Sequence, residues 1–198
     1  MKAAGLSFQN STLEVTILGG KGLLKEEAPI ALPPSAAEKT SVLNGHLLRW
    51  KKDHGIKGVV VGLDLGGFSH HFIELPLKSE KDIKNALPFE MEKHLPLPPD
   101  EYIHGFHTVS TAGKTSKNLV LSIRKEKLGW ITESLKDTGL KLLGIRCSLL
   151  EALNEFISSG AAPTAVFVQV SGHAFHIAGV SNAAPAYLRA SRNESEAR

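Results

Sequence analysis

Residues 59–76 read VVVGLDLGGFSHHFIELP, and this stretch decides the fold class of the chain. Its first part, residues 59–63, is an uninterrupted apolar run that predicts a strand buried on both faces. A glycine-rich turn follows, and residues 68–75 predict a second strand that ends before Pro76. A strand buried on both faces is typical of a parallel or mixed central sheet covered by helices. The stretch therefore predicts an α/β protein.

Two groups of short predicted strands lie on either side of this stretch. Each group has three members, at residues 3–8, 13–18 and 22–26 and again at residues 165–171, 174–180 and 186–190. Polar or glycine-containing turns separate the members, which is typical of antiparallel sheets. One strand pattern repeated at such long spacing indicates two similar halves with a module inserted between them.

Helices and further strands are predicted between the two groups. Ser35 and Glu38 form a capping box that predicts a helix start. Apolar residues then recur on one helical face, namely Leu43, Leu47 and Trp50. A second helix is predicted after Ser79, with a stripe of Ile83, Leu87, Met91 and Leu95, and Pro88 inside it should kink it. Two antiparallel strands are expected at residues 102–110 and 118–123, joined by a polar loop at residues 111–117. The remaining predictions are a helix at 124–138, a strand at 140–147 and a helix at 148–160.

Composition excludes several classes of protein. The chain has 198 residues, of which 42% are hydrophobic and 22% charged, with a net charge of +3. This balance excludes a disordered tail, and no run of apolar residues is long enough to span a membrane. So few excess positive charges do not indicate a nucleic-acid binder. The single cysteine, Cys147, excludes a disulfide framework and is expected to be buried, in a protein of a reducing compartment.

The segment after the opening stretch resembles a known family. Ile73-Glu74-Leu75-Pro76 is followed in order by residues 79–83 (SEKDI), Ala86, Glu90, Leu95-Pro96 and Asp100-Glu101. This succession resembles the PilM family of type IV pilus assembly proteins, in which a strand ending in Leu-Pro leads to a helix that ends at proline and an acidic pair. The cytoplasmic domain of GspL from type II secretion is similar. Further matching pieces are residues 118–122, Gly139-Leu140 and residues 150–153.

The resemblance implies an actin-like, ribonuclease-H-like subdomain with an inserted small α+β subdomain. Residues 1–62 would begin subdomain 1A, residues 63–144 would form the inserted subdomain 1C, and residues 145–164 would return to subdomain 1A. Residues 165–198 would be the opening strands of a second lobe. The chain is therefore expected to be truncated, with one lobe and the start of another.

The resemblance also implies a function, that of a non-catalytic cytoplasmic scaffold peripheral to the bacterial inner membrane. Its partner would be a membrane-anchored PilN-like peptide or a GspE-like secretion ATPase, and nucleic acid and direct membrane insertion are not expected. The kinked helix would line a groove for the partner with Leu87, Phe89, Glu90 and Met91. The resemblance leaves open which of the two machines the chain serves and whether it forms a homodimer.

The positions where actin-like ATPases bind phosphate have lost their acids. Ser7 stands where the family has an aspartate, Gln9 stands where it has a glycine, and Asn10 and Ser11 complete this turn. In the second turn, Gln169 stands at the acid position and Ser171 at the glycine position. A hydroxyl or an amide cannot supply the charge that Mg²⁺ coordination requires. We therefore expect no hydrolysis and no ATP or Mg²⁺ cofactor.

An alternative is an ATP-binding actin-like protein with weak or no hydrolysis, which would use residues 7–12 and residues 64–67. Residues 64–67, Asp-Leu-Gly-Gly, match a phosphate turn when taken alone. Because they follow the buried strand and lead into the inserted subdomain, we interpret them as a turn between subdomains. Of the nine histidines, His104 and His107 are three apart, as are His173 and His176, and in a strand this spacing puts the side chains on opposite faces. No acidic residue lies beside them at metal-ligand spacing, so no metal site is expected.

Overall fold

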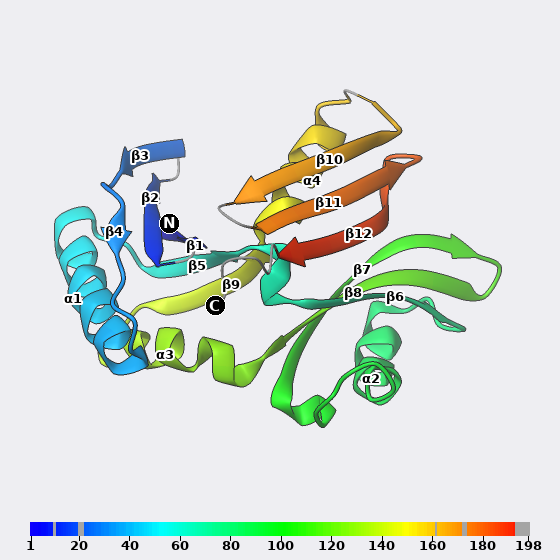
Figure 1. Cartoon of the computed structure of the whole chain (residues 1–198), viewed down its shortest axis with the longest axis horizontal. Helices are drawn as coiled ribbons and strands as arrows, with labels where there is room; N and C mark the ends of the chain where they lie inside the picture. The colour runs from blue at the N-terminus through cyan, green and yellow to red at the C-terminus, as the bar shows by residue number, and fades with distance from the viewer. Residues whose placement is uncertain (10, 20–21, 161, 172–173, 193–198) are drawn as a thin grey trace. The chain divides into compact units, whose positions relative to one another are not determined.

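The computed structural model describes residues 1–9, 11–19, 22–160, 162–171 and 174–192 (Figure 1). The chain forms two compact units. The first combines Met1–Asp64 with Leu128–Glu151, and the second combines Leu65–Lys127 with Ala152–Arg198. The chain first passes between the units at Asp64 and Leu65, inside the glycine-rich turn that follows the buried strand.

The first unit is built on a mixed six-stranded sheet. Its members are β1 (Ala3–Gln9), β2 (Thr12–Gly19), β3 (Gly22–Glu26), β4 (Ile30–Ala31), β5 (Gly58–Leu63) and β9 (Lys141–Cys147). The order is β3-β2-β1-β5-β9, and β4 pairs with β2. Strand β5 lies between β1 and β9 and is parallel to both. This arrangement confirms the mixed central sheet predicted from residues 59–63.

Helix α1 (Ala36–His54) follows the sequence signals that predicted it. The Ser35 hydroxyl accepts a hydrogen bond from the Glu38 amide at 3.3 Å, and Gly55 ends the helix in the left-handed region with φ 68°. Its buried residues are Leu43, Leu47 and Trp50. Two further helices, α3 (Lys125–Leu135) and α4 (Ser148–Ser158), each cross from one unit into the other. None of the helices in the described residues is long and apolar enough to cross a membrane.

The second unit contains a three-stranded antiparallel sheet packed on helix α2 (Glu80–Met91). Its strands β6 (Ser69–Leu75), β7 (Tyr102–Ala112) and β8 (Thr115–Arg124) run in the order β6-β8-β7. Short 3-10 turns, η1 (Leu65–Gly67) and η2 (Pro99–Glu101), precede β6 and β7. The predicted stripe of α2 lies in the core, which consists of Ile73, Leu75, Ile83, Leu87, Met91, Leu95, Tyr102 and Val120.

The polar loop predicted at residues 111–117 is wrong in its length. Strands β7 and β8 continue through this segment and are joined by Gly113-Lys114, where Gly113 has φ 55°. Beside this segment, the Thr108 hydroxyl of β7 donates to Oδ1 of Asn118 on β8 at 2.8 Å, and Nδ2 of Asn118 donates to the hydroxyl of Ser116 on the same strand at 2.8 Å. Ser116, which was predicted in the loop, is thus buried and hydrogen-bonded within the hairpin, while residues 111–114 are exposed.

A second antiparallel sheet of three strands completes the second unit. Its strands are β10 (Ala165–Ser171), β11 (Ala174–Ser181) and β12 (Ala184–Arg192), in that order across the sheet. One face packs on α4, where the Phe156 and Phe167 rings meet edge to face with centroids 4.6 Å apart. The three predicted C-terminal strands are therefore confirmed.

Candidate functional site

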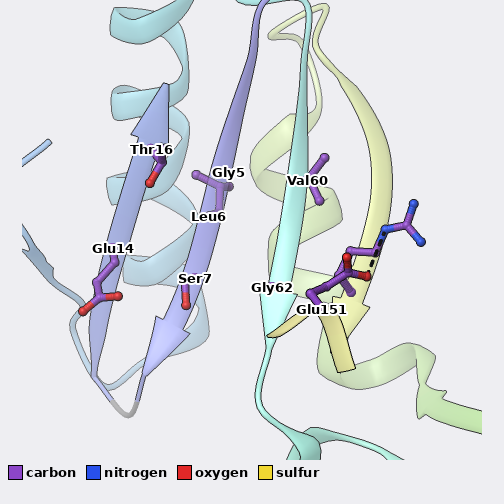
Figure 2. A pocket seen from close by; sticks show the side chains of 9 residues that line it. Gly5, Leu6, Ser7, Glu14, Thr16, Val60, Gly62 and Glu151 are labelled. Carbon is purple, nitrogen blue, oxygen red and sulfur yellow. Dashed lines mark ion pairs between the residues drawn. The ribbon is translucent and has the colours of Figure 1, made fainter. Parts of the chain in front are cut away.

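A trough of about 350 Å³ lies on one face of the sheet of the first unit. Its floor is formed where β1 and β5 run side by side, with Gly5 opposite Val60 and Ser7 opposite Gly62 in register. Two of these four positions have no side chain, and the missing atoms leave the hollow (Figure 2). The alternation of side chains along the strands puts Leu6 on the opposite, buried face.

The walls of the trough are polar. Glu14 and Thr16 of β2 lie opposite Ser7 and Gly5 in the antiparallel register, so that their side chains stand beside the floor (Figure 2). Across the floor, Nε of Arg146 on β9 lies 3.9 Å from a carboxylate oxygen of Glu151 on α4. The trough is thus bordered by one carboxylate on the β2 side and by an ion pair on the β9 side.

The charges of the trough are unfavourable for a phosphate group. Its lining residues include two carboxylates, Glu14 and Glu151, and one cation, Arg146. The guanidinium is already paired with Glu151, so an incoming phosphate would compete with that carboxylate and face the second. Among the described residues, no three His, Cys, Asp or Glu side chains come together in a way that could hold a metal ion. The trough suits a neutral or cationic group.

The structure places the predicted first phosphate turn at the end of β1 and just beyond it. Ser7 lines the trough beside Gly62. Ser11 is exposed in the turn between β1 and β2, where its carbonyl accepts a hydrogen bond from the Leu32 amide at 2.6 Å. Gln9 ends β1, but its side chain lies outside the described residues, as does Asn10 altogether. Ser7 is therefore the residue of the predicted first phosphate turn that lines the trough.

The predicted second phosphate turn lies in the other unit. Gln169 is half-buried on β10, and Ser171 ends that strand with its side chain outside the described residues. The turn interpreted as a connection between subdomains, residues 64–67, forms the 3-10 turn η1 after Asp64. Leu65 is buried there, and Nζ of Lys127 donates to the Gly67 carbonyl at 3.4 Å. This geometry supports a connecting turn at residues 64–67.

The four residues predicted to contact a partner are divided between core and surface. Leu87 and Met91 are only 2% and 0% exposed because they pack on the sheet of the second unit. Phe89 is 75% exposed. The Glu90 carboxylate pairs with Nζ of Lys93 at 2.9 Å. Since a partner cannot reach the buried pair in this structure, the surface that remains from this prediction is Phe89 with Glu90.

Cys147, His104 and His71 lie in surroundings that fit a structural role. Cys147 is buried, as predicted, and burial is the main cause that raises the pKa of its thiol. His104 bridges two elements of the second unit, with Nδ1 2.8 Å from the Ser122 hydroxyl and Nε2 3.2 Å from the Pro99 carbonyl oxygen. The rings of His71 and His94 lie 4.9 Å apart, and burial lowers the pKa of His71, followed by the charges of His94 and His70.

Sequence reasoning missed the walls of the trough. Glu14, Arg146 and Glu151 are far apart in the sequence and meet only through strand register and the start of α4. A signal was present in the alternation of β1, where Gly5 and Ser7 share one face while Ala4 and Leu6 share the other. That alternation predicts an open face, but it does not tell which residues border it.

Similar proteins are found among solved structures but not among family models or curated sequences. No protein-family model and no curated protein matches the sequence. Two solved structures with the same fold belong to a type IV pilus complex and to a type II secretion system. One is from a PilM-PilN type IV pilus biogenesis complex, at 17% identity and a TM-score of 0.78, covering 96% of this chain and 61% of that chain. The other is the cytoplasmic domain of EpsL, an inner-membrane component of the type II secretion system of Vibrio cholerae, at 11% identity and a TM-score of 0.62, covering 97% and 71%.

A third similar structure is described as having an actin-like ATPase fold. It is a protein of unknown function from Bacteroides thetaiotaomicron, with 9% identity and a TM-score of 0.56, covering 97% of this chain and 70% of that one. The present chain spans 61% of the length of the PilM-PilN chain that it matches. These likenesses confirm the predicted fold class, and the chain has the actin-like ATPase fold.

Proposed function

We propose that this chain is a non-catalytic scaffold at the inner-membrane platform of a type IV pilus or type II secretion system. The observation that carries the proposal is the likeness to a chain of the PilM-PilN complex, with a TM-score of 0.78 over 96% of this chain. The likeness to EpsL, an inner-membrane component of type II secretion, supports the same setting. The scaffold would lie on the cytoplasmic side of the inner membrane and hold a PilN-like peptide or a GspE-like ATPase.

The trough supports a role without nucleotide chemistry. Ser7 occupies the position that the resemblance assigns to an acid, and the nearest charged groups of the trough are the carboxylates of Glu14 and Glu151 with Arg146. A nucleotide phosphate placed there would meet more negative than positive charge.

Phe89 supports binding through the second unit. Its ring is 75% exposed on α2, while the same helix is fastened to the sheet by Ile83, Leu87 and Met91. An exposed aromatic ring on a well-packed helix is suited to anchor a partner, because burying it removes a large apolar area from water. Glu90, beside it, would add a polar contact at the rim.

Titration calorimetry would test the proposal directly. The probes are the N-terminal cytoplasmic segment of a PilN-like protein and a GspE-like ATPase encoded in the same genome. We expect saturable binding of one of them, weakened about tenfold or more by Phe89→Ala because an anchor ring loses about 1.5–3 kcal/mol of burial. Leu48→Ala removes another exposed apolar side chain, 46% exposed on α1, and should leave the affinity unchanged. Absence of binding to both probes would contradict the scaffold function.

A nucleotide titration separates the scaffold from the ATP-binding alternative. We expect no saturable heat when Mg²⁺ and ATP are added to the whole chain. Micromolar binding that Asp64→Ala abolishes would favour an ATP-binding actin-like protein and contradict a role without nucleotide.

A further inference from the structure

Three lysines stand side by side where the parallel strands of the first unit begin. Lys2 precedes β1, Lys57 precedes β5 and Lys141 opens β9. The backbone holds them together, because the Lys57 amide donates to the Lys2 carbonyl at 2.9 Å and the Lys141 amide donates to the Lys57 carbonyl at 3.2 Å. Neighbouring strands lie about 4.8 Å apart, and all three residues are exposed. This end of the sheet therefore presents a compact line of cations to solvent.

The end of α1 brings two more lysines to the same place. Lys51 and Lys52 lie in its last turn, and both are exposed. Nζ of Lys51 donates to the Thr138 carbonyl at 2.6 Å, in the segment that leads into β9. Lys51 therefore also serves the fold, through this hydrogen bond and through the helix dipole, which is negative at this end. We call the surface formed by Lys2, Lys51, Lys52, Lys57 and Lys141 the basic end of the first unit.

Acidic side chains do not cancel the charge of the basic end. Among the described residues, no carboxylate forms an ion pair with one of its lysines. The carboxylates of the adjoining turns are Asp53 and Asp137, while Glu133 is paired with Lys136. The five lysines exceed these two carboxylates by three, which equals the net charge of the whole chain. The rest of the chain is neutral overall, so its excess positive charge is concentrated at this end.

We propose that the basic end is a docking surface for the anionic headgroups of a lipid bilayer. The choice of a membrane rests on the proposed function, which puts the chain at an inner membrane. Clustered lysines are attracted to a bilayer that contains anionic lipids, and each lysine near the surface strengthens binding about fivefold. Contact through this end would also orient the first unit, because the trough lies toward the other ends of β1 and β5, away from the bilayer.

Two features favour a bilayer over a nucleic acid. Leu143 is 38% exposed beside the lysines of the strand starts, where it leans over Gly58. An apolar side chain among lysines gains by reaching the acyl boundary of a membrane. Proteins that hold single-stranded nucleic acid stack its bases on aromatic rings. The exposed aromatic residues of the described chain, Phe89, Phe175 and Tyr187, all belong to the second unit, so the basic end offers no such ring.

Co-sedimentation of the whole chain with lipid vesicles, in the absence of any other protein, tests the proposal. We expect binding to vesicles of equal parts phosphatidylglycerol and phosphatidylcholine, and none to pure phosphatidylcholine or in about 0.5 M salt, where screening removes the attraction. Lys57→Gln combined with Lys141→Gln should weaken binding at least about tenfold. Lys57→Arg combined with Lys141→Arg keeps both charges and should bind as the wild type does. Circular dichroism checks that each variant folds.

Two lysines of the second unit supply a matched control. Lys81→Gln combined with Lys84→Gln removes the same charge from exposed positions on α2 and should leave binding nearly unchanged. Equal weakening by the two Gln pairs, or equal binding to neutral and anionic vesicles, would overturn the proposal. So would tighter binding to duplex DNA than to anionic vesicles at matched phosphate concentration. Because the vesicles carry no PilN-like or GspE-like partner, a failure to bind them overturns this inference alone and leaves the scaffold proposal to its own titrations.

Discussion

A methyl group on Gly58 would lie 2.6 Å from the carbonyl oxygen of Lys141, on the neighbouring strand of the central sheet. It would also lie 2.7 Å from Cγ of Leu143. Strands β5 and β9 therefore approach so closely at this point that only glycine fits. We expect Gly58→Ala to lower the free energy of unfolding by about 1–3 kcal/mol, the usual cost of overpacking a core.

Urea denaturation measures this effect, and Gly45→Ala is a control of opposite sign. A methyl group at Gly45, in the interior of α1, has no heavy atom within 4 Å. Because alanine favours helix more than glycine does, this variant should gain about 0.5–1 kcal/mol of stability. Equal effects at the two positions would contradict the close approach at Gly58.

The turn between β11 and β12 contains a residue that is conformationally strained. Asn182 and Ala183 have φ of 53° and 57°, and alanine is disfavoured in this left-handed region. The Ala183 amide donates to the Pro163 carbonyl at 2.8 Å, and glycine would keep that bond. Ala183→Gly should therefore raise the free energy of unfolding by about 0.5–1 kcal/mol. Ala184→Gly, in the adjoining strand, should lower it, and the two denaturation midpoints must move in opposite directions.

Cys147 should not react with thiol reagents while the protein is folded. Its side chain is 3% exposed, and burial raises the pKa of the thiol, so the reactive thiolate is scarce. Labelling with Ellman's reagent should be slow in buffer and fast in denaturant. If the native protein reacts as quickly as free cysteine does, then β9 does not bury this residue.

Stability should fall in mildly acidic solution because of His71. Burial lowers the pKa of this histidine in the folded state below that of the unfolded chain, and His94 and His70 lower it further. The unfolded state therefore binds the proton first, and the free energy of unfolding decreases as the pH falls below about 6.5. The decrease levels off below the folded-state pKa.

Denaturation at several pH values between 5 and 8 checks this dependence. His71→Gln should reduce the decrease, and His46→Gln should reduce it as well, since burial and Arg49 lower the pKa of His46. The exposed His107 supplies a control variant that should leave the profile unchanged. A profile that is flat in the wild type would contradict the half-buried environment of His71.

Local patterns predicted most of the fold, because they depend on residues close together in the sequence. The Ser35 cap and the stripe of Leu43, Leu47 and Trp50 set α1, and the apolar run of β5 set the central sheet. The hairpin of β7 and β8 was predicted too short, since polar Ser116 is buried at the start of β8, where it accepts from Asn118, and Asn118 in turn accepts from Thr108 on the other strand. Such pairing cannot be recognised before the register is known.

The candidate sites were predictable only in part. The sequence predicted that Leu87, Phe89 and Met91 belong to one amphipathic helix, and it placed Ser7 at the end of the first strand. Packing on the sheet then decided that Leu87 and Met91 are buried while Phe89 faces outward. Register decided that Glu14, Arg146 and Glu151 border one trough.

By itself, the sequence determined the cap of α1 at Ser35 and the strand alternation, because each follows from side-chain chemistry over a few positions. Tertiary structure alone decided the close approach of Gly58 to Lys141 and the hollow over Gly5 and Gly62. These features depend on which strands become neighbours, and that is set by the burial of apolar surface across the whole unit.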